Sequence, residues 1–260
     1  MRNKKSPEEI AQMRRQDYIT NKLLLVFTVA FVFIMYVMSL DNSKSTFEGF
    51  FALEGKIALG LGISGGIFVA GIVWMLVEKF VTKRDTEYKL FTGKHIAVVG
   101  LFATVCMYDL FSRVMNDPDA FARIYVFIPV VVALYIIYSS YQREFFMISL
   151  ASAFGGIAVW NVIDYVYGDP KTFTVAAIVA VAVICAVTVW AQMGKGKVSL
   201  FGRNFEIFKS DARYALMYLS YILIAALMLA VFAIDLAMYF VFGLIGYVVL
   251  VGIYYTVKLI

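Results

Sequence analysis

The chain has 260 residues, of which 62% are hydrophobic, 17% are aromatic and only 16% are charged. Charged residues make up about 25% of an ordinary soluble domain, so this composition excludes a single water-soluble core. The formal net charge is +5 at pH 7. The polar segments separate apolar blocks of about 20 residues, the length that an α-helix needs to cross a bilayer.

These blocks predict an all-α integral membrane protein with about eight transmembrane helices arranged as helical hairpins. The predicted spans are residues 22–40, 56–80, 95–113, 122–141, 145–165, 170–192, 213–234 and 236–257. We expect them to form a single transmembrane domain over residues 22–260, preceded by a cytoplasmic segment over residues 1–21. The blocks leave no room for a separate soluble domain.

The N-terminal segment begins with a capping box formed by Ser6, Pro7 and Glu9. The serine can cap free backbone amides, proline suits the first helical position, and the glutamate lies at the third. This pattern predicts a short amphipathic helix from Pro7 to about Tyr18. Two readings of its arginines remain open: contact with anionic headgroups, or a solvated charged helix.

The distribution of basic residues predicts the orientation of the chain. Of the 23 Lys and Arg residues, 18 fall in the N-terminal segment, in every second connection and at the C-terminus, and five fall on the other side. Basic residues near helix ends stay in the cytoplasm. The sequence therefore predicts cytoplasmic N- and C-termini in the plasma (inner) membrane, with the bilayer and its anionic lipids as partners of the cytoplasmic Lys and Arg.

Small residues predict close packing between helices. Gly62 and Gly66 form a G-x-x-x-G pair in the second span, and Gly155 and Gly156 are adjacent in the fifth. Glycines at such positions let helix backbones approach one another within a bilayer, where the hydrophobic effect does not drive association. We expect these four glycines to pack against neighbouring helices.

An internal repeat relates residues 98–139 to residues 150–191. Its anchor is the match of Asp117-Pro118 with Asp169-Pro170. An aspartate that caps a helix, followed by a proline at the first helical position, is typical of a helix start. The repeat therefore predicts two parallel helical hairpins.

Four polar residues lie near the predicted outer boundary of the membrane. They are Asp109, Asn161, Asp164 and Asp235. Ionisable groups at membrane depth are costly, so such residues are candidates for a substrate or ion pathway. On adjacent helices, the four would line an acidic, outward-facing vestibule that attracts cations. In the alternative, Asp235 caps the eighth helix and Asp164 reaches water.

Pro129 lies midway along the fourth span. Its ring removes the hydrogen bond to the carbonyl of Tyr125, which predicts a kink. Kinks of this kind serve as hinges in transporters and also occur as passive packing features. Both interpretations remain open.

The longest cytoplasmic connection, residues 194–213, alternates basic and apolar residues. The alternation predicts either a short hairpin that turns near Gly202 or a segment that lies in the headgroup layer. Tyr214, Tyr218 and Tyr221 follow at helical spacing, which favours anchoring at the membrane interface over lining of a pore. The positive-inside pattern already accounts for the basic charge, so the sequence predicts no nucleic-acid partner.

The sequence contains neither a P-loop nor an H-E-x-x-H motif. A lone histidine, His95, and two cysteines, Cys106 and Cys185, do not provide the convergent ligands of a typical zinc site. We therefore predict no metal, no cofactor and no catalytic residue. An enzymatic role is less favoured than a non-enzymatic one.

Three functions remain open. We favour a small-solute or cation transporter or channel-like protein with an acidic outward-facing vestibule. The second is a membrane-embedded partner or assembly subunit, in a homo-oligomer or with another protein, that docks through its basic cytoplasmic segments. The third is a membrane enzyme that acts on a lipid-linked substrate.

Overall fold

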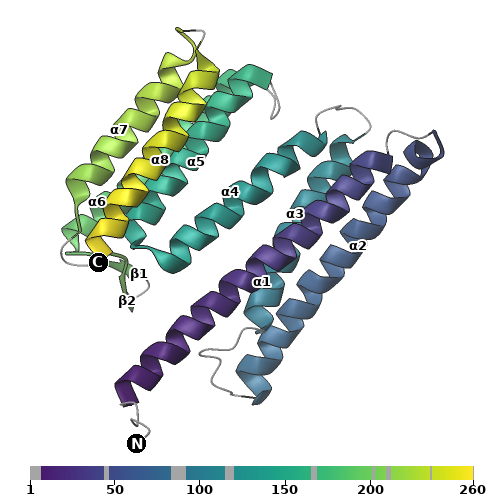
Figure 1. The fold of residues 1–260 in the computed structure, drawn as a ribbon, viewed down its shortest axis with the longest axis horizontal. Helices are drawn as coiled ribbons and strands as arrows, with labels where there is room; N and C mark the ends of the chain where they lie inside the picture. The colour runs from purple at the N-terminus through teal and green to yellow at the C-terminus, as the bar shows by residue number, and fades with distance from the viewer. Residues whose placement is uncertain are drawn as a thin grey trace, which may run out of the picture. The chain divides into compact units, whose positions relative to one another are not determined.

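The computed structural model of the chain describes residues 7–43, 47–82, 92–114, 120–164, 169–200, 203–208, 212–234 and 236–259. Its elements are helices joined by short connections, with one small hairpin of strands (Figure 1). The helices are α1 (Pro7–Ser43), α2 (Phe47–Val77), the π-helical turn η1 (Glu78–Thr82), α3 (Gly93–Arg113), α4 (Ala120–Ser140), α5 (Arg143–Asp164), α6 (Pro170–Met193), α7 (Tyr214–Ala230) and α8 (Ala237–Leu259). The strands are β1 (Lys197–Leu200) and β2 (Arg203–Glu206).

Among the residues described, seven helices are long and apolar enough to cross a membrane, namely α1 to α6 and α8. Many of their large apolar side chains are exposed, as expected for helices that face lipid. These observations support the prediction of an all-α membrane protein. Helix α7 is also apolar but has 17 residues, because the chain leaves the helix at Val231 and forms turns before the predicted end at residue 234.

The predicted N-terminal helix and the first predicted span are one continuous helix, α1, with 37 residues. Neither glycine nor proline occurs between Pro7 and Gly49, so no residue in this stretch breaks the helix. The part from Gln16 to Ser43 has the length and hydropathy of a membrane span. The polar residues before Gln16 therefore form the first turns of the same helix that contains the apolar span.

The chain divides into two compact units, residues 1–132 and residues 133–260. That residues 22–260 form one transmembrane domain stays a prediction. The division falls inside α4, three residues beyond Pro129. Helix α4 is continuous across this proline. Each unit has its own hydrophobic core.

Unit 1 contains α1, α2, α3 and the first part of α4. Its core joins residues of all four helices, including Leu40, Ile57, Leu110 and Phe121. Helices α2 and α3 meet backbone to backbone: a Cβ added to Gly71 or Gly100 would lie closer than 3.0 Å to main-chain atoms of the other helix. Two helices can approach this closely only where the side chains are absent.

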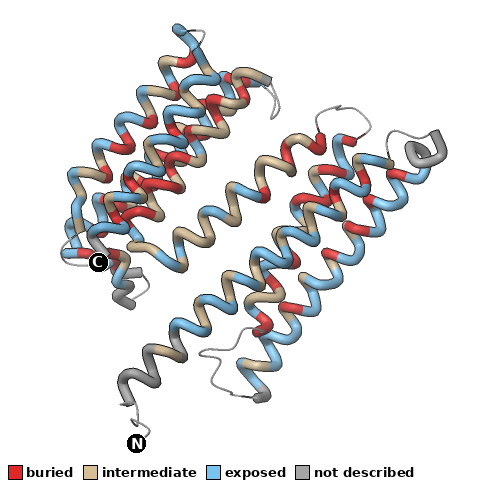
Figure 2. The backbone as a smooth tube through the Cα atoms, in the orientation of Figure 1, coloured by how far each residue is buried: buried red, intermediate tan, exposed pale blue. Residues whose placement is uncertain are grey.

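Unit 2 contains the rest of α4, helices α5 to α8 and the hairpin. Figure 2 shows buried residues along α5, which packs against α6, α7 and α8. Its core includes Ile148 of α5, Ile224 of α7 and Tyr255 of α8, all fully buried. A Cβ added to Gly155 would lie 2.6 Å from Ile224 Cγ2, so α5 and α7 approach closely at this glycine.

The other predicted packing glycines lie in open positions. Among the residues that the structure describes, nothing lies within 4 Å of a Cβ added to Gly62, Gly66 or Gly156. The close contact of α2 is instead made one to three turns further along, at Gly71 and its neighbours. That the G-x-x-x-G pair packs against another helix therefore stays a prediction.

The connection after α6 forms the hairpin, one of the two structures predicted for it. Strands β1 and β2 are antiparallel, with Lys197 opposite Glu206 and Leu200 opposite Arg203. Lys195 and Gly196, in the turn between α6 and β1, both have positive φ. The carbonyl of Gly196 accepts hydrogen bonds from the next two residues after β2, which closes the base of the hairpin.

Candidate functional site

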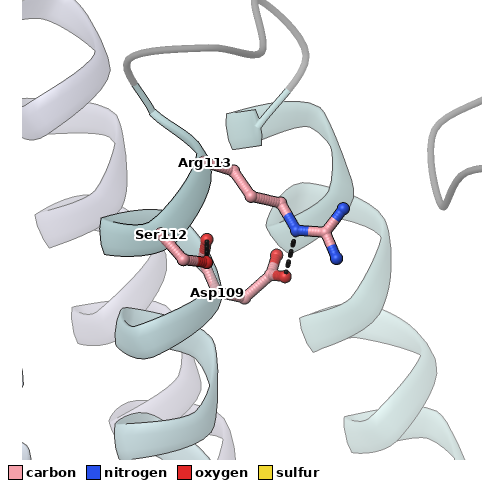
Figure 3. Close-up of polar contacts among 3 residues, drawn as sticks. All are labelled: Asp109, Ser112 and Arg113. Carbon is pink, nitrogen blue, oxygen red and sulfur yellow. Dashed lines mark hydrogen bonds and ion pairs between the residues drawn. The ribbon is translucent and has the colours of Figure 1, made fainter.

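The structure gives Asp109 a local partner. Its carboxylate pairs with Arg113 Nε at 3.0 Å, one turn further along α3, and the Asp109 side chain is 34% exposed (Figure 3). Ser112 Oγ donates a hydrogen bond to the Asp109 carbonyl. An exposed ion pair of this kind contributes at most about 1 kcal/mol. Arg113 therefore neutralises the charge of Asp109 in the last turns of α3.

The other three predicted pathway residues belong to unit 2. Asn161 is fully buried in the interior of that unit. Asp164 ends α5, and its side chain lies outside the described residues, as does all of Asp235. A vestibule that unites these residues with Asp109 of unit 1 stays a prediction.

An open, shallow pocket of about 370 Å³ with a largely apolar lining lies at the end of unit 1 where α1 ends. It is lined by Met38, Asp41 and Asn42 of α1 and by Tyr125 of α4. The Tyr125 hydroxyl donates a hydrogen bond to Asp41 Oδ2 at 3.1 Å. The pocket therefore combines a carboxylate, an amide, a phenol and a thioether.

The position of Asp41 is unfavourable for the helix that carries it. Asp41 lies two residues before the end of α1, where the helix dipole is negative and repels a carboxylate by about 0.3–1 kcal/mol. The neighbouring Lys56 ammonium donates to Ser43 Oγ at 3.1 Å and supplies a nearby positive charge. The hydrogen bond from Tyr125 offsets part of this cost and joins α1 to α4.

A hydrogen bond also joins α1 to α2 in unit 1. The Tyr36 hydroxyl of α1 donates to the Lys56 carbonyl of α2 at 3.0 Å. Pro129 lies one turn after Tyr125 on α4 and supplies no N–H to the Tyr125 carbonyl. The Tyr125 carbonyl therefore lacks its usual helical donor.

A second polar cluster lies inside unit 2. Glu144, in the first turn of α5, is only 3% exposed. Its Oε2 accepts hydrogen bonds from the Tyr255 hydroxyl of α8 at 2.8 Å and from the backbone N–H of Arg213 at 3.2 Å. The buried carboxylate therefore ties together the start of α5, the start of α7 and the end of α8.

Other polar side chains of unit 2 bond to one another across its helices. Tyr221 is buried and pairs with Thr188 at 3.1 Å, and Ser220 pairs with Tyr247 at 2.6 Å. The prediction that Tyr221 anchors the protein at the membrane interface was wrong, because this tyrosine faces α6 inside the bundle. These pairs satisfy buried polar groups and hold helices together.

A further polar cluster lies where α2 and η1 end and α3 begins. Glu78 accepts from Trp74 Nε1 at 2.8 Å and from the backbone N–H of Gly93 at 2.9 Å. Its carboxylate thereby caps α3, while the Thr92 hydroxyl lies 2.9 Å from His95 Nδ1. Within the described ranges, no group of three or more His, Cys, Asp or Glu residues could hold a metal ion.

Sequence reasoning missed the pocket and the buried glutamate. Asp41 directly follows the first apolar block, which makes it look like an ordinary flanking charge. Its partner Tyr125 is 84 positions away. A single sequence holds no signal that brings these two residues together.

These observations define the chain as a multi-pass α-helical membrane protein. Comparisons with protein-family models, curated proteins and solved structures give no match. The function is therefore argued from the residues of the chain itself.

Proposed function

We propose that the chain is a small-solute or cation transporter, or a channel-like protein, that receives a cation or protonated solute in the pocket at Asp41. The observation that carries this proposal is the open pocket lined by Asp41, Asn42 and Tyr125. A carboxylate, an amide oxygen and a phenol oxygen are ligands that suit a cation or an ammonium group. The negative potential of the Asp41 carboxylate, which lines this open pocket, would attract cations.

The structure of α4 supports a transport role. The two units share this helix, and the boundary between them lies three residues beyond Pro129. A helix with a missing backbone hydrogen bond bends at a lower cost than an intact one. Pro129 would act as the hinge on which one unit moves relative to the other.

Helix bounds support the proposed hairpin repeat. Shifted by 52 residues, the bounds of α3 and α4 fall within two residues of those of α5 and α6. Internal repeats are common in transporters, in which substrate sites lie at the repeat interface.

We infer that α7 is the eighth membrane span. Its 17 residues extend about 25 Å, at the lower limit for crossing the hydrocarbon layer. Within unit 2 it runs alongside α5, α6 and α8 (Figure 1). Eight spans place both termini on one side, and the basic residues make that side the cytoplasm of a plasma (inner) membrane.

The test compares two charge-removing variants at the same end of unit 1. Purified protein is screened for thermal stabilisation by alkali cations, divalent cations and alkylammonium ions, and uptake of the stabilising cation is measured in proteoliposomes. We expect Asp41→Asn to abolish stabilisation and uptake. Asp109→Asn removes the same charge from an ion-paired residue and should keep the cation response.

Two results would contradict the proposal: a wild-type protein that responds to none of these cations, or an Asp41→Asn variant that responds as strongly as the wild type. Loss of the response in both variants would move the binding site toward the predicted vestibule around Asp109.

The second candidate is a membrane-embedded partner or assembly subunit. The folded hairpin favours it, because Val198 and Phe208 anchor β1 and β2 in the core of unit 2. A fixed hairpin at a helix end presents a defined surface to another protein. Co-purification that depends on β1 and β2, with no cation response, would support this function over transport.

A further inference from the structure

The hairpin is fixed rigidly to one end of unit 2. The side chains of Val198 and Phe208 are buried in the core, and the Phe208 ring packs against Tyr214 edge to face with a centroid distance of 5.8 Å. The Arg143 guanidinium donates to the carbonyl of Glu206 in β2. The hairpin therefore has a defined position beside the start of α5 and the end of α6.

Exposed basic side chains gather around this fixed hairpin. They are Arg143 at the start of α5, Lys195 between α6 and β1, Lys197 at the start of β1, and Arg213 just before α7. Arg143 and Arg213 also make contacts within unit 2. Arg143 bonds to the Glu206 carbonyl, and the Arg213 guanidinium lies 5.6 Å from the centre of the Tyr254 ring. Lys195 and Lys197 extend from the surface that the hairpin holds in place.

Lys195 occupies a backbone conformation that disfavours lysine. Its φ is 53°, in the left-handed region where glycine or asparagine is preferred. The turn itself would be less strained with glycine. A lysine at this position is therefore better explained by its ammonium group than by the needs of the turn.

Exposed apolar side chains at the end of α6, here called the apolar wall, precede these lysines in the chain. Met193, two residues before Lys195, is 82% exposed, and Trp190 is 46% exposed one turn earlier on α6. Tryptophan is enriched at the level of lipid headgroups, with apolar side chains in the acyl region below. A ligand with an anionic head and an apolar body matches both parts of this surface.

We propose that Lys195 and Lys197, with the exposed wall of Trp190 and Met193, bind the headgroup of an anionic phospholipid. This proposal is independent of the transport role. Each basic residue near an anionic membrane surface contributes about 1 kcal/mol, or about fivefold in affinity. A free phosphate would engage the ammonium groups without using the apolar wall.

The test measures phospholipid binding to the purified full chain in nonionic detergent. Phosphatidylglycerol and phosphatidylcholine are titrated separately, with native mass spectrometry and thermal unfolding as readouts. We expect the wild type to bind phosphatidylglycerol preferentially. The variant Lys195→Gly with Lys197→Gln should bind it at least about tenfold more weakly.

The choice of glycine separates folding from binding, because it relieves the backbone at position 195. The lipid-free variant should therefore unfold at the wild-type temperature or above it. Lys195→Arg with Lys197→Arg keeps the charges and should keep the preference. Lys171→Gln, at the opposite end of α6, should leave it unchanged.

Equal binding of both lipids by the wild type would overturn the proposal, as would an unchanged preference after the Lys195→Gly and Lys197→Gln substitutions. An equal loss in Lys171→Gln would show that net charge, and not this surface, selects the lipid. Stabilisation by inorganic phosphate to the same extent would assign the site to a free anion.

Discussion

The Tyr125 hydroxyl of α4 donates a hydrogen bond of 3.1 Å to the Asp41 carboxylate of α1, across 84 positions of the chain. This bond joins the first and fourth helices of unit 1 at the pocket. Under the proposed function, the other oxygen of this carboxylate would bind the cation. Stability and binding at this end of the protein should therefore respond to the same residue.

We expect Tyr125→Phe to lower the free energy of unfolding by about 1 kcal/mol, because it removes a hydrogen bond to a charged acceptor that is partly open to water. Thermal unfolding in detergent measures the loss. Asp41→Asn should cost less, since the amide oxygen can still accept from Tyr125. A larger loss in Asp41→Asn than in Tyr125→Phe would contradict this assignment.

Glu144 should be the most sensitive polar residue of unit 2. Replacement by Ala leaves the Tyr255 hydroxyl and the Arg213 amide without this acceptor, which costs about 2–4 kcal/mol in a buried setting. Chemical unfolding of Glu144→Ala, Tyr255→Phe and the double variant gives a double-mutant cycle. The two losses should not add, because each removes the same hydrogen bond. Additive losses would show that the two residues act separately.

Glycine substitutions should distinguish the two faces of α2. Gly71→Ala introduces a Cβ that would lie closer than 3.0 Å to the backbone of Ala97, so we expect a loss of about 1–3 kcal/mol from overpacking. Gly62→Ala, on the same helix, meets no described atom within 4 Å and should be neutral or slightly stabilising. Unfolding measurements in one detergent compare the pair. Destabilisation by Gly62→Ala would instead support the predicted packing at the G-x-x-x-G pair.

The start of α6 should weaken in acid. The pKa of Asp169 lies below its usual value of 3.8 because the Thr172 side chain and backbone N–H both donate to its carboxylate. A lowered folded-state pKa means that the cap stabilises the fold above the unfolded-state pKa and is lost as the pH falls through the folded-state value. Asp169→Asn keeps an acceptor for the cap and should flatten this dependence. Melting temperatures of both proteins between neutral pH and about pH 3 test the difference; equal slopes would exclude Asp169 as the source.

Local patterns in the sequence determined the class of the protein. The free energy of transferring a helix into lipid is nearly the sum of contributions from its own residues. An apolar block of about 20 residues therefore predicts a spanning helix without knowledge of the rest of the fold. The start of α6 was also predicted from a local pattern, because Asp169, Pro170 and Thr172, which form its cap, lie within four positions of the chain. The hairpin after α6 was one of two predicted structures for a segment with alternating basic and apolar residues.

Tertiary structure decided which polar groups and glycines meet. Tyr221 was predicted to lie at the membrane interface, but its partner Thr188 is on another helix, and only the packing of α6 on α7 brings them together. Helical periodicity cannot tell a glycine that faces a neighbouring helix from one that faces lipid, because both environments are apolar. For the same reason Gly71, and not Gly62, marks the close contact of α2 with α3. The pocket at Asp41 depends on a contact between distant residues, which the pattern of one chain does not encode locally.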